Sequence, residues 1–513
     1  MEAVTNNHQT IINPSDLSDL YFTKTSSTAS KNTSNYNHCS YVNPDIKIAR
    51  SKLHGRGLFA KQDIEAGVCL FVTPAIVHVD PMKFRRIILG EDDGIERGSG
   101  DLEKVAMELL LEEMKDVVEK ADAKSSVDGG NVYIGQLNAL LELVGSSSLN
   151  EELLLSDEGC NDDGQNECMV ASDQLVETLL GNHVQCGKWN DSDDNSSRML
   201  ASDDELRRII LKNAFGPDFI SYSQMQQYWE YAGDSTEEKT SPLFQIPHIL
   251  GMFPLAAIIN HSCVANAVRS YADGDIMIAH ASSLIKKGQE ITWTYFPPTT
   301  SLIDRRRALK RRHGFVCKCD RCIFESSNLK NDMLPINIKS YITAAKKWNL
   351  SLSSTELTSE SKNLCIAFSN MEDYVYGSTF SNEFKRSLRI SNTKLHFNYF
   401  NAALLVAGSN LDFKESILKS AMQLHFSFIS MGAQASTEHL SLLHLCYDLA
   451  NDIYREKQSM QPIKFWTDQL KRTHMIRYGD LGKNLENVRK VMSHTKGILR
   501  QKDGYRKAIY CFL

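Results

Sequence analysis

Three closely spaced cysteines are the strongest chemical signal in the sequence. Cys317, Cys319 and Cys322 supply three thiols within one short segment. A structural zinc ion takes four ligands at the corners of a tetrahedron, so a fourth must come from elsewhere. Cys263, in an otherwise apolar stretch, is the best candidate, and we predict one structural zinc ion held by these four cysteines. One alternative stays open, in which Cys263 is a small buried core residue and His313 completes the metal site instead.

Two polar side chains directly follow an apolar run shortly before Cys263. Asn260 and His261 come after Ile258 and Ile259. Burying Asn and His at such a place is costly unless every polar atom finds a partner. The segment is therefore expected to serve a ligand or a hydrogen-bond network, although a structural turn capped by Asn260 explains it equally well.

A tyrosine stands at the end of the next apolar segment. The run from Ile291 to Phe296 has strand character and is followed by two prolines, which stop a strand because they lack a donor N–H. Tyr295 therefore lies at a strand end, where it is ordinarily just a half-buried aromatic residue. The order of the three features along the chain is what favours a functional role for it.

A glycine-rich segment precedes all of these features. Residues 54–60 read HGRGLFA, and the glycines let the backbone approach a ligand closely. The segment is not a dinucleotide-binding fingerprint, because no G-x-G-x-x-G opens a helix here. Taken alone it also fits any turn between strands.

Short strands are the elements expected to position these residues. Residues 46–79 hold apolar, β-branched runs separated by glycine, which predicts a small sheet with turns at Gly57 and Gly67. Strand character resumes over residues 209–219, and Asp273-Gly274 predicts a hairpin turn between apolar segments. A compact β unit thus brackets a very different stretch of chain.

That stretch, residues 80–205, is acidic and rich in Ser, Gly and Asn. One amphipathic helix is predicted over residues 102–119, with Asp101 as its N-cap. The remainder cannot bury enough apolar surface to fold by itself, so we expect loops and disorder inside a long insertion.

The chain after Cys322 is expected to be helical. Apolar residues at helical spacing predict helices over residues 394–407, 414–431, 438–454 and 462–475. Paired helices of this length favour a helix-hairpin array, but no repeat consensus is clear enough to identify tetratricopeptide units. The expected parts are a disordered tail (1–43), two halves of the β unit (44–79 and 206–298) around the insertion (80–205), a zinc segment (299–325) and a helical domain (326–513).

Composition limits the function classes. With 42% hydrophobic and 23% charged residues and a net charge of −6, the chain reads as a globular protein and not as a nucleic-acid coat. The basic run Arg305–Arg312 is interpreted as a solvated helix face, which argues against direct nucleic-acid binding. No secretory signal or uninterrupted membrane-spanning run is evident, so we expect a protein of the nucleus or cytoplasm whose twelve cysteines are thiols and metal ligands.

The motifs together resemble the SET-domain lysine methyltransferases, and most closely their SET and MYND branch. The matching segments lie within residues 48–79 and 211–322 and occur in the family's order: HGRGLFA, KNAFG, GMFPLAAIINHSCVANA, IKKGQEITWTYF and RRRALKRRHGFVCKCDRC. The resemblance implies an α+β fold, in which a SET domain of short β-sheets with a pseudoknot-like active site is split by the insertion. A cysteine-rich post-SET segment and the helical domain would follow it.

The resemblance also implies an activity and a set of site residues. The activity is methyl transfer from S-adenosylmethionine to the ε-amine of a lysine in a histone or non-histone protein. Tyr295 would be the catalytic residue and, with Phe215, would wall the lysine channel. The methyl donor would be bound by His54, Arg56, Gly57, Leu58, Asn213, Asn260, His261, Tyr295 and Phe315. The zinc ligands of the family match Cys263, Cys317, Cys319 and Cys322.

One departure from this branch concerns its MYND zinc finger. Cys160, Cys168, Cys186 and His183 fall short of the ligands that such a two-zinc module needs, so we predict that it is missing. The alternative to an enzyme is a catalytically weak SET-derived scaffold that binds protein partners through its helical domain. The retained Asn260, His261, Tyr295 and Phe315 favour activity, because a scaffold needs none of them.

Overall fold

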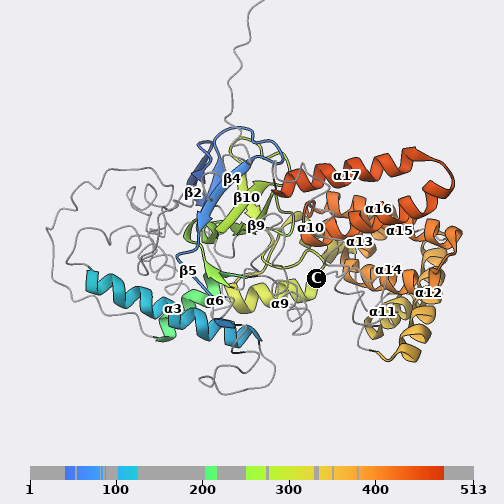
Figure 1. Cartoon of the computed structure of the whole chain (residues 1–513), viewed down its shortest axis with the longest axis horizontal. Helices are drawn as coiled ribbons and strands as arrows, with labels where there is room; N and C mark the ends of the chain where they lie inside the picture. The colour runs from blue at the N-terminus through green and yellow to red at the C-terminus, as the bar shows by residue number, and fades with distance from the viewer. Residues whose placement is uncertain are drawn as a thin grey trace, which may run out of the picture.

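Short strands occupy the centre of the computed structural model, helices α11–α17 lie on one side, and α3 and α6 lie below (Figure 1). The structure describes residues 41–51, 55–80, 83–84, 87, 102–124, 203–216, 250–272, 276–328, 334–348, 352–377 and 380–478. The predicted α+β class is confirmed. The turn expected at Asp273-Gly274 and most of the insertion lie outside the described residues.

Three small sheets form the β unit. The first has the order β1 (Tyr41–Val42), β4 (Cys69–Pro74), β10 (Ile276–Ala281) and β9 (Ala267–Ala272). The second has the order β2 (Ile46–Ser51), β3 (Gly55–Ala60), β11 (Glu290–Trp293) and β8 (Asn260–His261). The third joins β5 (Val77–His78), β7 (Gly251–Met252) and β6 (Ala214–Phe215). Gly57 lies inside strand β3 and not at a turn, whereas Gly67 takes a positive φ of 88° in a turn as expected.

The pairing of β8 with β11 brings distant residues together. The two strands run parallel, with Asn260 beside Thr292, and Asn266 braces the pair. Its side-chain amide donates to the Glu290 carbonyl at 2.8 Å, and its oxygen accepts from the Thr292 N–H at 2.8 Å. Because Asn266 is buried, these bonds replace lost water and fix the register of the crossing. The residues after β11, including Tyr295, are thereby held next to β8.

The prediction of a strand over residues 209–219 is wrong for the first half of that segment. Residues Asp203–Asn213 form helix α6, Ala214–Phe215 are strand, and residues 217–219 lie outside the described residues. Leu206, Ile209 and Ile210 are buried at helical spacing against helix α3 (Leu102–Lys124), so packing decides a pattern that fits either element. Helix α3 matches the helix expected over residues 102–119 and extends beyond it.

The C-terminal half is built from helices as expected. Each of the four predicted helices is present within a few residues of its expected bounds, as α14 (Thr393–Ala407), α15 (Leu411–Ser430), α16 (Thr437–Glu456) and α17 (Met460–Tyr478). Before them come α9 (Leu302–His313), α10 (Asp320–Asn328), α11 (Ile336–Lys347), α12 (Ser354–Tyr376) and α13 (Asn382–Ser391). Successive helices from α11 onward share one buried core that includes Phe368, Phe400 and Trp466.

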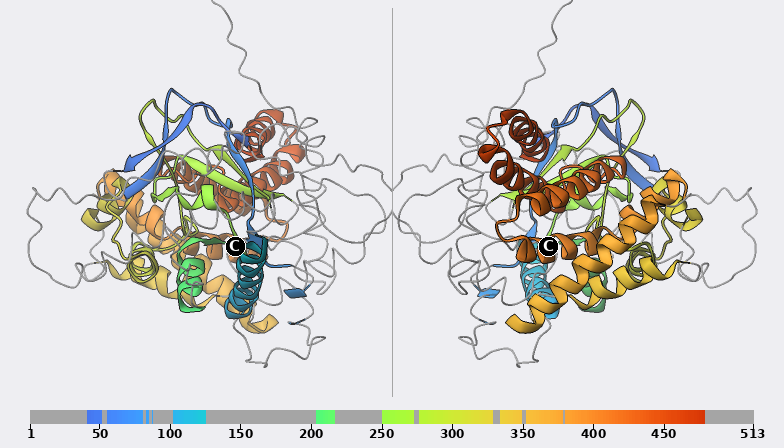
Figure 2. Two further views of the ribbon diagram at one scale, coloured as in Figure 1. Left: turned by 90° about the vertical axis from the view of Figure 1, so that its left-hand side faces the viewer. Right: turned by 90° about the vertical axis from the view of Figure 1, so that its right-hand side faces the viewer.

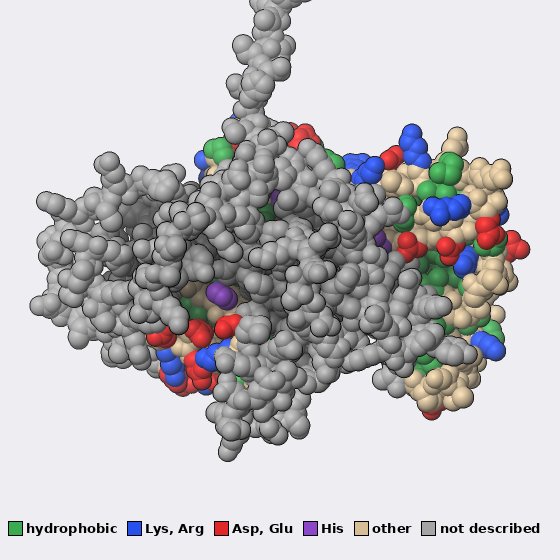
Figure 3. Space-filling view, in the orientation of Figure 1, with side chains coloured by type: hydrophobic (Ala, Val, Ile, Leu, Met, Phe, Trp, Pro, Cys, Tyr) green, Lys and Arg blue, Asp and Glu red, His purple; other side chains and the backbone are tan. Residues whose placement is uncertain are grey.

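The helical region packs directly onto the β unit. Helix α17 lies against β9 and β10 (Figure 2). The loop after α15 also reaches the β unit, because a Cβ at Gly432 would lie 2.8 Å from a Val264 methyl carbon. On the face that Figure 3 shows, positive and negative side chains are interspersed over these helices. Among the described residues, no helix combines the length and apolar character of a membrane span.

Two buried histidine pairs in this region give a testable pH dependence. His425 Nδ1 lies 2.9 Å from His439 Nε2, and His444 lies 3.1 Å from His474. Burial lowers the pKa of His425 to about 4 and that of His474 to about 3, below the ordinary value near ~6.5. The fold thus holds both rings neutral, and the unfolded chain binds more protons as the pH falls below ~6.5.

We expect the free energy of unfolding to be highest above about pH 6.5 and to decrease as the pH falls towards about 4. The decrease should reach up to about 1.4 kcal/mol per pH unit for each such ring. Urea titrations across this range measure it. His474→Phe should flatten the slope relative to the wild type. An equal slope in the two proteins would contradict a role for this histidine.

Candidate functional site

A cavity of about 370 Å³ opens between the β unit and the start of the helical half. Its walls come from helices α3 and α6, strands β6 and β9, helix α8 (Pro254–Ala257), the residues after β11 and the end of α9. Tyr295 and Phe215 line it, together with Arg269 and His313. Aromatic and cationic side chains therefore meet in one hollow.

Tyr295 is held from two sides. Its hydroxyl donates to the Ile259 carbonyl at 2.9 Å, and its backbone N–H donates to His261 Nδ1 at 3.0 Å. Its ring lies 4.7 Å from that of His313. Burial raises the pKa of Tyr295, so the phenol is protonated at neutral pH. A hydroxyl fixed as a donor to one carbonyl presents its lone pairs to another partner.

Phe215 forms the apolar wall. Its ring lies edge-on to Trp293 at 5.4 Å and to Phe253 at 6.3 Å. The guanidinium of Arg269 on β9 lies 5.5 Å from the Phe215 ring and 5.2 Å from the Trp293 ring. Sequence reasoning missed Arg269, because no spacing rule distinguishes one arginine on a strand. Only the structure reveals Arg269, by the stacking of its guanidinium on the rings of Phe215 and Trp293.

A polar cluster lies beside strand β3, which carries the glycine-rich segment. Asn260 donates its amide to Glu290 Oε1 at 2.7 Å, and the Ser51 hydroxyl donates to Glu290 Oε2 at 2.9 Å. Gly57 faces this cluster, where a Cβ would lie 2.9 Å from Asn260 Nδ2 and closer still to Glu290 Oε1. The glycine thus allows close packing here, because a Cβ would force the ends of the Glu290 and Asn260 side chains to shift. Glu290 is a further residue that the sequence did not reveal.

Gly57→Ala should therefore destabilise the protein by about 1–3 kcal/mol, because the added carbon overpacks the cluster. Thermal unfolding measures this loss. Ser51→Ala is the comparison, because it removes one hydrogen bond to Glu290 without adding atoms, and it should cost less. A Gly57→Ala protein as stable as the wild type would show that Glu290 moves aside freely.

The other predicted donor-binding residues are placed as follows. Leu58 is fully buried in the sheet core, and Asn213 donates to the Ile209 carbonyl at 3.1 Å at the end of α6. Phe315 lies 6.3 Å from the His261 ring, among the residues packed on the cysteine cluster. Asn213, Asn260, His261 and Phe315 are not among the residues that line the cavity. His54 and the side chain of Arg56 lie outside the described residues, as do Cys160, Cys168, Cys186 and His183.

The four predicted zinc ligands converge on one point. Their sulfur atoms all lie within 4.8 Å of one another, with Cys263 Sγ 3.9 Å from Cys317 and 3.5 Å from Cys322. A tetrahedron with Zn–S bonds near ~2.3 Å has edges of about 3.8 Å, so the thiols fit a zinc ion. Hydrogen bonding with Cys263, and to a lesser degree with Cys322, lowers the pKa of Cys319 to about 6. The alternative ligand His313 lies against Tyr295 and is not a member of this group.

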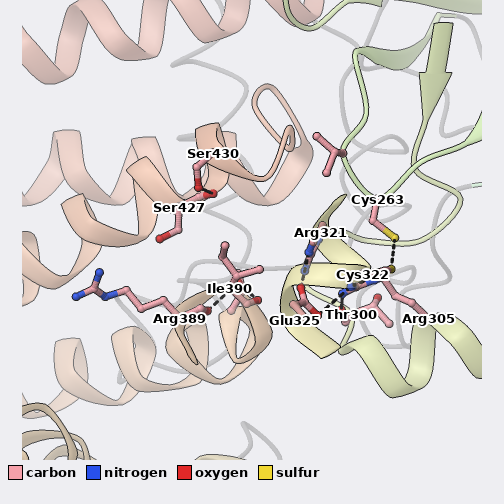
Figure 4. Close-up of polar contacts among 12 residues, drawn as sticks. Cys263, Thr300, Arg305, Arg321, Cys322, Glu325, Arg389, Ile390, Ser427 and Ser430 are labelled. Carbon is pink, nitrogen blue, oxygen red and sulfur yellow. Dashed lines mark hydrogen bonds and ion pairs between the residues drawn. The ribbon is translucent and has the colours of Figure 1, made fainter. Parts of the chain in front are cut away.

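Buried charges surround the cluster. Arg305 and Arg321 flank Glu325 beside Cys322 (Figure 4). The interpretation of the basic run as a solvated face is wrong for Arg305, which is 1% exposed, although it holds for Arg307. Arg305 lies one helical turn before the buried Leu309, and this spacing is the sequence signal that could have revealed it.

Comparison with known proteins agrees with this arrangement. Residues 55–296 match the SET-domain family model. The chain contains a SET domain. The match spans the strands that carry Gly57, Asn260 and Glu290 and ends next to Tyr295, so the predicted family resemblance is confirmed.

Relatives share short segments of the chain. A protein of Arabidopsis thaliana named histone-lysine N-methyltransferase ASHR1 is 40% identical over 76 residues, covering 15% of this chain and 16% of that one. Isoform B of the Drosophila melanogaster SET domain-containing protein SmydA-8 is 35% identical over 74 residues, with 14% and 16% covered. The chain thus matches 16% of the length of each. A crystal structure of the SET domain of LSMT, bound to lysine and AdoHcy, is 14% identical over 88% of this chain and 94% of that chain, with a TM-score of 0.24.

Proposed function

We propose that this protein transfers a methyl group from S-adenosylmethionine to the ε-amine of a lysine in a protein, histone or non-histone. The observation that carries the proposal is Tyr295, whose hydroxyl is fixed at a cavity of a SET domain immediately beside four converging thiols. Relatives named as histone-lysine methyltransferases support it. We further propose residence in the nucleus or cytoplasm and, for the helical domain, contacts with protein partners.

Bound S-adenosylmethionine supplies a methyl group on a sulfonium. A lysine amine attacks the methyl carbon in line, so that a C–N bond forms while the C–S bond breaks, and the neutral thioether S-adenosylhomocysteine leaves. The protein must therefore present a neutral, oriented lysine amine. A free lysine has a pKa near ~10.4, and an apolar, cation-lined cavity lowers it by desolvation and like-charge repulsion. Phe215 provides the apolar wall, and Arg269 provides a fixed positive charge.

Tyr295 would orient the amine. Because its hydroxyl proton is donated to the Ile259 carbonyl, its oxygen is available to accept an N–H from the lysine amine. His261 holds the backbone of Tyr295 and so fixes the height of the ring. The donor would lie along the backbone of His54, Arg56, Gly57 and Leu58 and against Asn213, Asn260, His261, Tyr295 and Phe315.

One zinc ion would be held by Cys263, Cys317, Cys319 and Cys322. Cys263 follows β8, whereas Cys317 and Cys319 lie between α9 and α10 and Cys322 lies in α10, so the metal would join two distant parts of the chain. Phe315 and Tyr295 pack on the cluster, and the ion would fix both rings relative to each other. Its function is then structural, and it takes no part in the chemistry.

Incubation of the full chain with a proteome and isotope-labelled S-adenosylmethionine tests the function. Mass spectrometry should find the label on lysine ε-amines of specific proteins. Calorimetry should find that the purified chain binds the donor. A chain that binds no donor and labels no lysine is a scaffold, and the proposed activity is then wrong.

A further inference from the structure

Three buried charged residues form a chain beside the cysteine cluster. Arg305 on α9 donates through Nη2 to Glu325 Oε2 at 3.0 Å and lies 3.8 Å from Cys322 Sγ (Figure 4). Arg321 donates through Nε to Glu325 Oε1 at 2.6 Å. Arg305 is 1% exposed, Arg321 is 4% exposed and Glu325 is fully buried. Burying two guanidinium groups around one carboxylate leaves one excess positive charge away from water.

The cysteine cluster supplies the charge that balances this excess. Four thiolates around a divalent zinc ion carry two excess negative charges. With the metal bound, the net charge of the cluster and the three residues is closer to zero with Arg305 than it would be without it. Glu325 contacts both Arg305 and Arg321, so this one carboxylate does not balance the two guanidinium groups.

The geometry suits a guanidinium and no simpler cation. Arg305 donates through Nη1 to the Thr300 carbonyl at 2.6 Å while Nη2 faces both Glu325 and Cys322. A planar fork can hold three acceptors in fixed directions, whereas a lysine ammonium is a flexible point charge. Thr300 precedes α9, and Cys322 lies in α10, so Arg305 ties the two helices together at the cluster.

We propose that Arg305 is a positioning residue of the zinc site, which holds the Cys322 sulfur by an N–H···S bond and stabilises the protein more strongly when the metal is bound. The inference rests on the proposed zinc ligands and is independent of methyl transfer. Partners of metal ligands outside the coordination sphere commonly change metal affinity by about 10–100-fold. Arg305 is expected to act within this range.

The test compares Arg305→Met with Arg307→Met in the full chain. Both substitutions remove a guanidinium from the same helix, but the side chain of Arg307 is 73% exposed and points away from the cluster. Transfer of zinc to a chromogenic chelator should be about 10–100-fold faster for Arg305→Met than for the wild type. Arg307→Met should release zinc at the wild-type rate.

Thermal unfolding provides a second readout. Arg305→Met should lower Tm more in the zinc-loaded protein than after chelation, because the cluster of zinc and four thiolates carries the negative charge that Arg305 offsets. A merely structural arginine would lower Tm equally in both states. Such an equal loss, or an unchanged rate of zinc release, overturns the inference.

Arg305→Lys keeps the test decisive if the methionine variant does not fold. It retains the charge but not the fork, so zinc release should be faster than in the wild type, and a wild-type rate overturns the inference. Metal analysis of the wild-type chain comes first. A chain without zinc refutes the ligand assignment itself, while a zinc-loaded chain whose Arg305 variants behave as wild type refutes only the role of Arg305.

Discussion

Tyr295→Phe is expected to lower kcat for lysine methylation by about 100-fold, with a much smaller change in affinity for S-adenosylmethionine. The substitution keeps the ring that packs against His261 and His313 but removes the oxygen that would orient the amine. Misplacement of a reacting group by about 1 Å can cost about 100-fold in rate. The measurement is methyl transfer to an identified substrate at saturating donor, with donor binding by calorimetry.

The loss of the hydroxyl also leaves the Ile259 carbonyl without this donor, which costs about 1–3 kcal/mol of stability. Tm is therefore measured alongside the rate, so that partial unfolding is not mistaken for lost chemistry. Tyr374→Phe, on the exposed side of α12, is the control and should retain full activity. If the Tyr295→Phe protein is folded and as active as the wild type, the assigned catalytic role is wrong.

Cys263→Ser should abolish stoichiometric zinc binding and lower both Tm and donor affinity. Cys263 is the only one of the four thiols that comes from the strand side of the cluster, so its loss opens the tetrahedron and unties α9 and α10 from β8. The loss of a direct ligand should weaken zinc binding by more than about 100-fold, the upper effect of an indirect partner. Zinc analysis, thermal unfolding and donor calorimetry measure the three effects.

Chelation of the wild-type protein should reproduce the behaviour of Cys263→Ser, and added zinc should reverse it. The matched control is Cys365→Ser, because Cys365 is a partly buried thiol of α12 outside the cluster. Retention of zinc at wild-type affinity in Cys263→Ser would assign the metal to other ligands. Retention of donor affinity in a zinc-free protein would separate the metal from the donor site.

Different parts of the site were open to prediction to different degrees. Cys317, Cys319 and Cys322 were visible because their ligand spacing is local. Asn260 and Tyr295 were visible because a polar residue after an apolar run, or an aromatic residue before a proline pair, breaks the regular pattern. Arg269 and Glu290 were missed, because an isolated charged side chain leaves no such mark. Arg305 was missed although its helical spacing from Leu309 places both on one face.

The sequence by itself determined the helices of the C-terminal half, the order of the motifs and the thiols that can bind a metal. These features depend on neighbours a few residues apart, which periodicity and spacing record. Only the tertiary structure decided that residues 203–213 form a helix, that Gly57 packs tightly against Glu290 and Asn260 and that Arg305 is buried while Arg307 is not. Each of these depends on atoms brought close by folding from distant parts of the chain, and short-range sequence patterns alone do not decide such contacts.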